Sequence, residues 1–161
     1  MNASPAIFSS VQEAQPYIDS LRTAGKTVVS TNGCFDILHT GHVRYLAEAA
    51  ALGDLLIVGI NSDRSVRRFK GPSRPVQKER DRLLIVGSLR TVDCAFVFEE
   101  DDPRAFIEVV RPDIHVKGGD YTPGQIIEKP VVEKYGGTVR LLSYVQGYST
   151  SSLIESVSSR S

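Results

Sequence analysis

Two histidines, His39 and His42, lie in the part of the chain with the greatest capacity to handle an anion. The segment TNGCFDILHTGH (31–42) leads from a β-branched run into a helical pattern that begins near His39. Residues three apart share a face of a helix, so both rings can point at one phosphate beside the free N–H groups of the helix start. Imidazole donors there can neutralise charge that develops on an oxygen as a P–O bond breaks.

Two glycines support a phosphate site in this segment. Gly33 directly follows the predicted strand and allows a ligand to approach the backbone, and Gly41 keeps the surface between the histidines open. An H-x-x-H pattern can also arise by chance or bind a metal. Zinc is disfavoured, because no third Cys, His or carboxylate sits at ligand spacing, and Asp36 is the only near candidate. The sequence contains neither a P-loop nor a G-x-G-x-x-G dinucleotide motif.

The elements that must position these groups alternate between strand and helix. Strand candidates lie at 27–31, 55–60, 94–98, 113–117 and 139–143, separated by helical stretches. Such alternation predicts a single doubly wound, Rossmann-like α/β domain, with a parallel five-stranded sheet covered by helices on both faces. We expect an N-terminal helical extension at residues 1–24, opened by a capping box at Ser10 and Glu13, and a core at 25–161.

Composition limits the function classes. The 161 residues carry 19 basic and 19 acidic side chains, and this zero net charge argues against a nucleic-acid partner. No apolar run approaches the roughly 20 residues that span a bilayer, and the first residues do not resemble a signal peptide, so we expect no membrane contact. Two cysteines are too few for a disulfide framework, which favours a reducing, cytoplasmic compartment.

Ligands of doubly wound sheets bind beyond the carboxyl ends of the strands. Four segments that leave the predicted strands, 32–42, 61–63, 117–121 and 144–151, are rich in Gly, Asp, Ser, Thr, His or Lys. The sequence therefore predicts that they meet at one site.

The string GCFDILHTGH resembles the G-x-F-D-x-x-H-x-G-H motif of the cytidylyltransferase-like nucleotidyltransferases. LIVGINSD (56–63), FKG (69–71) and GYSTSSLIE (147–155) extend the resemblance over nearly the whole chain. Within that superfamily, KGPSRPV and VKGGDY are most similar to the adenylyltransferases of D-glycero-β-D-manno-heptose 1-phosphate. These occur as one half of a two-domain kinase–adenylyltransferase or alone, and this chain, which has no kinase half, looks like the stand-alone form.

The resemblance implies a role for each matching residue. His39, His42 and Lys70 would be catalytic, with Lys70 on a mobile loop. The same three residues would bind the nucleotide together with Thr31, Asn32, Gly33, Cys34, Phe35, Gly41, Arg82, Lys117, Gly118, Gly119, Asp120, Ser149 and Thr150. The sugar phosphate would meet Asp36, Asn61 and Asp63.

Structural roles compete with several of these assignments. An arginine early in a helix, such as Arg82, is usually a surface residue. Ser149 first suggests a helix N-cap, Asp63 can equally cap a helix, and Cys34 is better explained by packing than as a nucleophile. We expect no protein-bound metal site.

The activity implied is transfer of AMP from ATP to a sugar 1-phosphate, with Mg²⁺ carried by the nucleotide. The partners implied are these two substrates and, as in relatives, a second copy of the chain. A cytidylyltransferase acting on glycerol phosphate, ethanolamine phosphate or a related alcohol phosphate is an alternative. Tyr144 stands where glycerol-phosphate enzymes carry arginine, which counts against that alternative. A nucleotide-sensing module without turnover is the other alternative.

Overall fold

The computed structural model describes residues 6–119, 121–143 and 146–160. Six parallel strands form one sheet: β1 (Ala6–Phe8), β2 (Val28–Gly33), β3 (Leu55–Asn61), β4 (Cys94–Phe98), β5 (Ile114–Gly118) and β6 (Thr138–Leu142). The helices are α1 (Val11–Thr23), α2 (Thr40–Ala50), α3 (Asp63–Lys70), α4 (Glu79–Gly87), α5 (Arg104–Val110), α6 (Lys129–Lys134) and α7 (Thr150–Ser158), with a 3₁₀ turn η1 at Pro123–Gln125.

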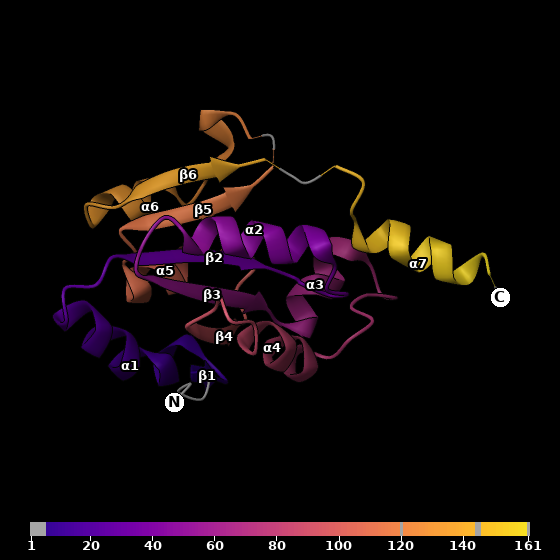
Figure 1. Ribbon diagram of the computed structural model, residues 1–161, viewed down its shortest axis with the longest axis horizontal. Coiled ribbons are helices and arrows are strands. Elements are labelled where there is room, and N and C mark those ends of the chain that lie inside the picture. The colour runs from indigo at the N-terminus through magenta and orange to yellow at the C-terminus, as the bar shows by residue number, and fades with distance from the viewer. Residues whose placement is uncertain (1–5, 120, 144–145, 161) are drawn as a thin grey trace.

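The strands lie in the order β1-β4-β3-β2-β5-β6, and every pairing is parallel (Figure 1). The chain runs outward from β2 through β3 to β4, then crosses to the other side of β2 to add β5 and β6. The order therefore reverses between β2 and β5, the position at which doubly wound sheets bind their ligands.

The prediction of a parallel α/β sheet is confirmed, but the prediction of five strands is wrong. The sixth strand, β1, pairs Ala6 with Cys94 and Phe8 with Phe96 at the edge of the sheet. Three residues are too few to show a periodic pattern, and a capped helix follows them at once, so the sequence offered no strand signal here. The segment predicted as a helical extension thus also supplies an edge strand.

Helices cover both faces of the sheet. Alternate strand residues point to opposite faces, so Leu56 and Val58 pack in the core beneath α2 and α4. Ile57, between them in β3, belongs to the core beneath α1, α5 and α6. Ala14 and Ile18 of α1 are fully buried in that second core. The N-terminal segment is therefore an integral part of the domain's packing.

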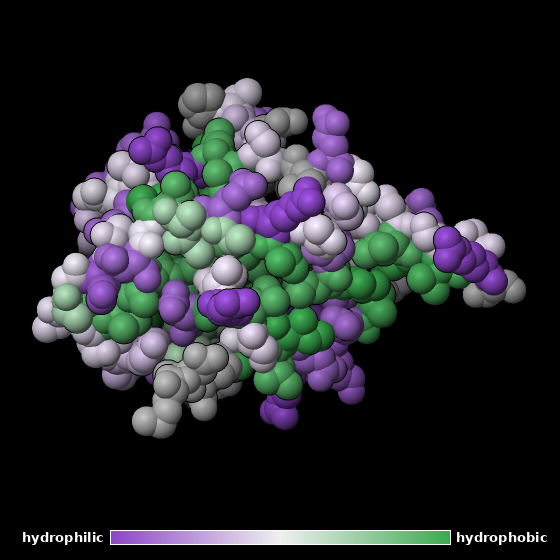
Figure 2. Space-filling view, in the orientation of Figure 1, coloured by the Kyte–Doolittle hydropathy of each residue, from purple (hydrophilic) through white to green (hydrophobic). Residues whose placement is uncertain are grey.

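The last helix differs from the others in its environment. In Figure 1, α7 projects away from the sheet at the far end from α6 and β6. Its nine residues contain no buried side chain. Figure 2 shows that apolar surface continues from the body of the molecule toward this helix, whose exposed large apolar side chains are Leu153 and Val157. Within the described residues, no helix is long and apolar enough to cross a membrane.

Candidate active site

The turn that leaves β2 is shaped by Gly33 and Phe35. Phe35 is buried and adopts φ +46°, which is uncommon for a residue with a side chain. Its ring folds back over the strand end, so a Cβ added at Gly33 would lie 2.9 Å from that ring. The packing of the Phe35 ring therefore requires a glycine at position 33. This is a stricter requirement than the one expected from the sequence, which was only that a ligand can approach the backbone there. The turn delivers the chain to the start of α2.

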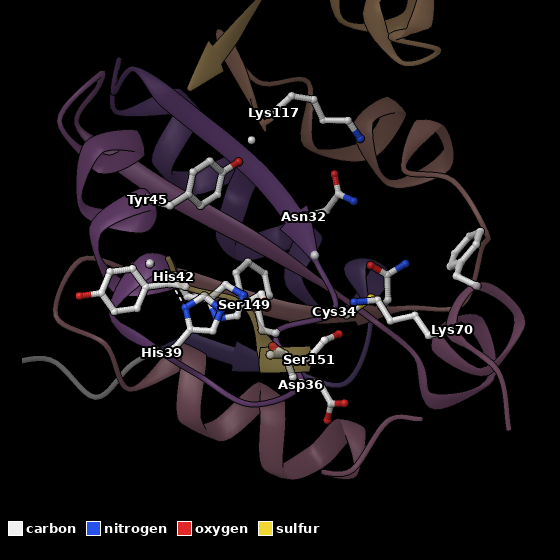
Figure 3. Close-up of a pocket in the computed structure, with 18 of the residues that line it drawn as sticks. Asn32, Cys34, Asp36, His39, His42, Tyr45, Lys70, Lys117, Ser149 and Ser151 are labelled. Carbon is white, nitrogen blue, oxygen red and sulfur yellow. Dashed lines mark hydrogen bonds between the residues drawn. The ribbon is translucent and has the colours of Figure 1, made fainter. Parts of the chain in front are cut away.

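The two histidines meet at that helix start. His39 is the N-cap of α2, and its Nδ1 accepts a hydrogen bond from the backbone N–H of His42 at 3.4 Å. Their rings stack with centroids 3.7 Å apart and planes 20° from parallel (Figure 3). An Nδ1 that accepts a hydrogen bond carries no proton, so the neutral His39 ring holds its proton on Nε2. The prediction that the spacing brings both rings together is confirmed.

Gly41 makes room for this stack. A Cβ at Gly41 would lie 3.0 Å from two atoms of the His39 ring and 3.0 Å from Cβ of Tyr148. The ring of Tyr148 is also close to parallel with that of His39, with centroids 6.3 Å apart. The glycine thus lets the segment before α7 approach the start of α2, and a side chain there would crowd both His39 and Tyr148.

Both imidazoles are neutral at pH 7. Burial lowers the pKa of His42 to about 4, with further lowering by the nearby His39 and Lys70. Burial also lowers the pKa of His39. The pair can therefore offer N–H donors to a phosphate without itself carrying charge, and the positive end of α2 adds to that attraction.

A cavity of about 700 Å³ opens in front of the histidines. It lies over the carboxyl ends of β2, β3 and β5, and Figure 3 shows Lys70 and Lys117 on different sides of it. The structure brings most of the predicted site residues to its wall: Asn32, Gly33, Cys34, Phe35, Asp36, His39, Gly41, His42, Asn61, Lys70, Lys117, Gly118, Ser149 and Thr150. Burial raises the pKa of the Cys34 thiol, which fits packing better than nucleophilic chemistry.

The floor of the cavity lies where β2 and β5 separate. These strands pair at Ser30 and His115, and beyond that point the hydroxyl of Thr31 donates to the carbonyl of Val116 at 2.9 Å. Tyr45 of α2 donates to the same carbonyl at 3.2 Å. Thr31 is fully buried and does not line the cavity, so its contact with the nucleotide stays a prediction.

Lys70 ends α3 at the rim of the cavity and is exposed. It forms no hydrogen bond or ion pair with another residue in the described part of the chain. The loop that follows is tethered by Asp36, whose carboxylate accepts from Arg74 Nε at 2.6 Å and from the backbone N–H of Val76 and Gln77. Asp36 is 1% exposed. Its geometry gives it a loop-anchoring role, and sugar-phosphate contact stays a prediction.

Arg82 lies behind the cavity wall, not at its surface. Its fully buried guanidinium donates to the carbonyls of Gln77 and Cys34 and to the carboxylate of Asp63 at 2.9 Å. Neither Arg82 nor Asp63 lines the cavity. Arg82 thereby ties the β2–α2 turn to α3 and to the loop before α4, and its contact with the nucleotide stays a prediction. Gly119 also lies outside the lining, and Asp120 falls outside the described residues.

The start of α7 forms a second helix N-terminus at the cavity. Ser149 is its N-cap, accepting from the N–H of Ser152 at 3.0 Å, as predicted. Thr150 donates to the carbonyl of Ile37, which ties this start to the β2–α2 turn. The sequence did not identify several residues that line the cavity. Most of them are aromatic or lie around the start of α7: Tyr45, Phe69, Tyr121, Gln146, Gly147, Tyr148 and Ser151. The only available signal was their proximity in sequence to the predicted segments.

A family model described as cytidylyltransferase-like matches residues 30–155. This range holds both helix starts, the histidine pair and Lys70. The chain belongs to the cytidylyltransferase-like family. Its curated relatives include proteins named bifunctional protein HldE, 55% identical over 86% of this chain in Syntrophotalea carbinolica and 52% identical over 84% in Geotalea uraniireducens. The chain spans 28% of the length of each of these relatives.

Solved structures of similar proteins share this cytidylyltransferase-like fold. A lipopolysaccharide core biosynthesis protein from Thermoplasma volcanium is 34% identical and superposes with a TM-score of 0.63, covering 78% of this chain and all of its own. A pantoate-β-alanine ligase from Francisella tularensis superposes with a TM-score of 0.62 over 86% of this chain and 66% of its own. At 17% identity, the ligase supports the fold alone.

Proposed function

We propose that this chain is an H-x-G-H nucleotidyltransferase that moves AMP from ATP onto a sugar 1-phosphate. The observation that carries the proposal is the stack of two neutral histidines, His39 on His42, at the N-terminus of α2. Donors grouped at a helix start suit a phosphate. Lys70, which has no ion pair with any residue that the structure describes, lies at the same cavity and supplies positive charge.

In the proposed reaction, an oxygen of the acceptor's phosphate attacks the α-phosphorus of ATP. A new P–O bond forms, and the bond between the α-phosphorus and the bridging oxygen breaks, with its electron pair leaving on pyrophosphate. A phosphate monoester with a second pKa of about 6 is already anionic at neutral pH, so no residue has to remove a proton. Catalysis then consists of positioning and charge stabilisation.

The residues divide this work. The N–H groups of His39 and His42 bind oxygens of the α-phosphate and the bridging oxygen as charge grows on it. Lys70, at the end of α3, approaches the triphosphate from another side of the cavity and balances the charge of the leaving pyrophosphate. The start of α7 at Ser149 offers a second set of backbone donors for an anion.

Magnesium belongs to the substrate in this proposal, as Mg·ATP. Among the described residues, Asp36 is the one carboxylate that lines the cavity, and Arg74 and two backbone N–H groups occupy its oxygens. A hard cation that keeps most of its waters and binds phosphate oxygens needs no further protein ligand. The cavity therefore suits a metal ion that enters already bound to the nucleotide.

The acceptor proposed is D-glycero-β-D-manno-heptose 1-phosphate, which would make the product an ADP-heptose for lipopolysaccharide core synthesis. The support is the identity of about half of the aligned residues with the proteins named HldE, and the likeness to a lipopolysaccharide core biosynthesis protein. A cytoplasmic location and a homodimer stay predictions.

A matrix of nucleotides against acceptors tests the function. ATP and CTP are each combined with heptose 1-phosphate, glycerol phosphate and ethanolamine phosphate, and pyrophosphate release is followed by a coupled assay. We expect release with ATP and heptose 1-phosphate. A preference for CTP would favour the cytidylyltransferase alternative, and no release from any pair at high enzyme concentration would favour a nucleotide sensor.

A further inference from the structure

A buried carboxylate stands directly behind the second lysine of the cavity. Lys117, at the end of β5, has a side chain 18% exposed, and its Nζ lies 2.5 Å from Oε1 of Glu128. Glu128 is the N-cap of α6 and is 1% exposed, so it does not itself line the cavity. The ammonium of Lys117 therefore bridges a buried anion and the open cavity.

Behind Glu128, the chain of polar groups continues to His115 and Ser30. His115 is fully buried, with Nε2 3.6 Å from Oε1 of Glu128 and Nδ1 2.8 Å from the hydroxyl of Ser30. Burial lowers the pKa of His115, so the ring is neutral at pH 7. Burial alone raises the pKa of the Glu128 carboxyl, but His115 and Lys117 outweigh this effect and lower it to about 2.

In this arrangement Lys117 is the counter-ion of the Glu128 carboxylate. Glu128 is ionised and His115 is neutral, so the cation that balances the carboxylate is Lys117, and the pair carries no net charge. Lys70 differs, because within the described part of the chain no carboxylate forms an ion pair with it. An ammonium has three N–H donors, so Lys117 keeps donors for the cavity while one faces Glu128.

We propose that Glu128 is a positioning residue that holds and neutralises Lys117, so that Lys117 donates a hydrogen bond to a neutral acceptor on the nucleoside and does not act as a phosphate-binding cation. The proposal rests on the proposed function and divides the nucleotide between the two lysines. Lys70 takes the triphosphate and Lys117 takes the nucleoside. Their positions on different sides of the cavity suit this division (Figure 3).

The surroundings of Lys117 favour a nucleoside over a phosphate. The ring of Tyr121 lies 5.7 Å from Nζ of Lys117 and lines the same part of the cavity. Tyr121 is 38% exposed, so its ring is accessible to a flat partner. The Lys117–Glu128 ion pair has no net charge, so it attracts a polyanion only weakly. Its remaining N–H donors suit the polar edge of a nucleobase, and the exposed ring of Tyr121 suits the flat face of the base.

Two double variants separate the roles without leaving a buried charge unpaired. Lys117→Met with Glu128→Gln removes the donor, and Lys117→Gln with Glu128→Gln restores a neutral N–H donor. Binding of ATP and of inorganic tripolyphosphate, each with Mg²⁺, is measured by calorimetry on the wild type, on both double variants, and on the single variants Lys70→Met and Glu128→Gln. Thermal unfolding checks that each variant is folded.

The methionine double variant should bind ATP roughly tenfold more weakly, as for one lost hydrogen bond to a charged group, with its affinity for tripolyphosphate unchanged. The glutamine double variant should recover part of the loss. Lys70→Met should weaken both ligands by the same factor. Glu128→Gln alone should strengthen tripolyphosphate binding and steepen its dependence on salt, because it uncovers the charge of Lys117.

An equal loss of ATP and tripolyphosphate affinity in the methionine double variant would make Lys117 a phosphate cation and overturn the proposal. Unchanged ATP affinity would overturn it too. These results are independent of turnover. A wild-type chain that binds ATP but releases no pyrophosphate would contradict the proposed function, while the comparison of ligands would still decide the role of Lys117.

Discussion

The imidazole of His39 lies against two other rings, that of His42 with centroids 3.7 Å apart and that of Tyr148 with centroids 6.3 Å apart. Its Nδ1 is engaged by the backbone of His42, so its position and its tautomer are both set before any ligand binds. Preorganised donors of this kind stabilise charge without reorganising during the reaction. His39 and His42 therefore act as one unit.

Replacing His42 by alanine should reduce turnover by at least about a hundredfold, in the range of a lost acid–base or donor group. His42 lies at the cavity wall, so the loss should leave the fold intact. Steady-state rates and circular dichroism spectra, compared with those of the wild type, check both parts. A variant with normal turnover would contradict the assignment of the histidine pair.

The pH dependence of stability should reflect His42. Its pKa is 6.5 when exposed and about 4 in the folded chain, so between these values the unfolded state binds a proton that the folded state does not. The free energy of unfolding should therefore be level above about pH 6.5 and fall as the pH drops toward 4.

Urea unfolding at about pH 7.5 and about pH 4.5 measures this fall. His39 and His115 contribute in the same direction, because burial lowers the pKa of each. His42→Asn should therefore reduce the fall but not abolish it. An identical fall in wild type and variant would show that His42 is not buried as described.

Gly41→Ala should impair turnover without unfolding the chain. The added Cβ would lie 3.0 Å from the His39 ring, so the ring has to give way by a few tenths of an ångström, which disturbs its stack with His42. A shift of this size in a catalytic group lowers rate far more than stability. Gly124→Ala is the matched control, because a Cβ there meets nothing within 4 Å. Equal turnover in the two variants would argue against the need for the stack.

Asp36→Asn should lower the free energy of unfolding by about 3 kcal/mol, because it leaves the partly buried Arg74 without its counter-charge. The exposed pair between Arg68 and Asp101 supplies a control, and Asp101→Asn should cost less than about 1 kcal/mol. Urea unfolding at neutral pH measures both. A cost at Asp36 no larger than that at Asp101 would show that the loop is not anchored through this carboxylate.

The alternation of strands and helices made the parallel sheet predictable, because buried strands such as Leu55–Asn61 are continuous apolar runs. Helix limits followed from local chemistry, as at the Ser10 and Ser149 caps. The edge strand Ala6–Phe8 was beyond prediction, since pairing with β4 decides it and three residues carry no period.

The site was predictable where the residues lie on the β2–α2 turn, because spacing along one helix fixes the relation of His39 to His42. It was not predictable where burial depends on tertiary partners. Nothing in the sequence indicated that Asp63 and two backbone carbonyls enclose the guanidinium of Arg82. Glu128 carried no motif at all, and only the approach of α6 to β5 brings it to Lys117.

The proposed function requires that the adenylyl group of ATP be transferred to the acceptor, and this transfer can be followed by isotope label. ATP labelled at the α-phosphate is incubated with heptose 1-phosphate and Mg²⁺, and the products are separated by chromatography. The label should appear in a nucleotide sugar that forms only when the acceptor is present, with unlabelled pyrophosphate released in equal amount. Label that stays in ATP, or that appears in AMP whether or not the acceptor is present, would contradict the account.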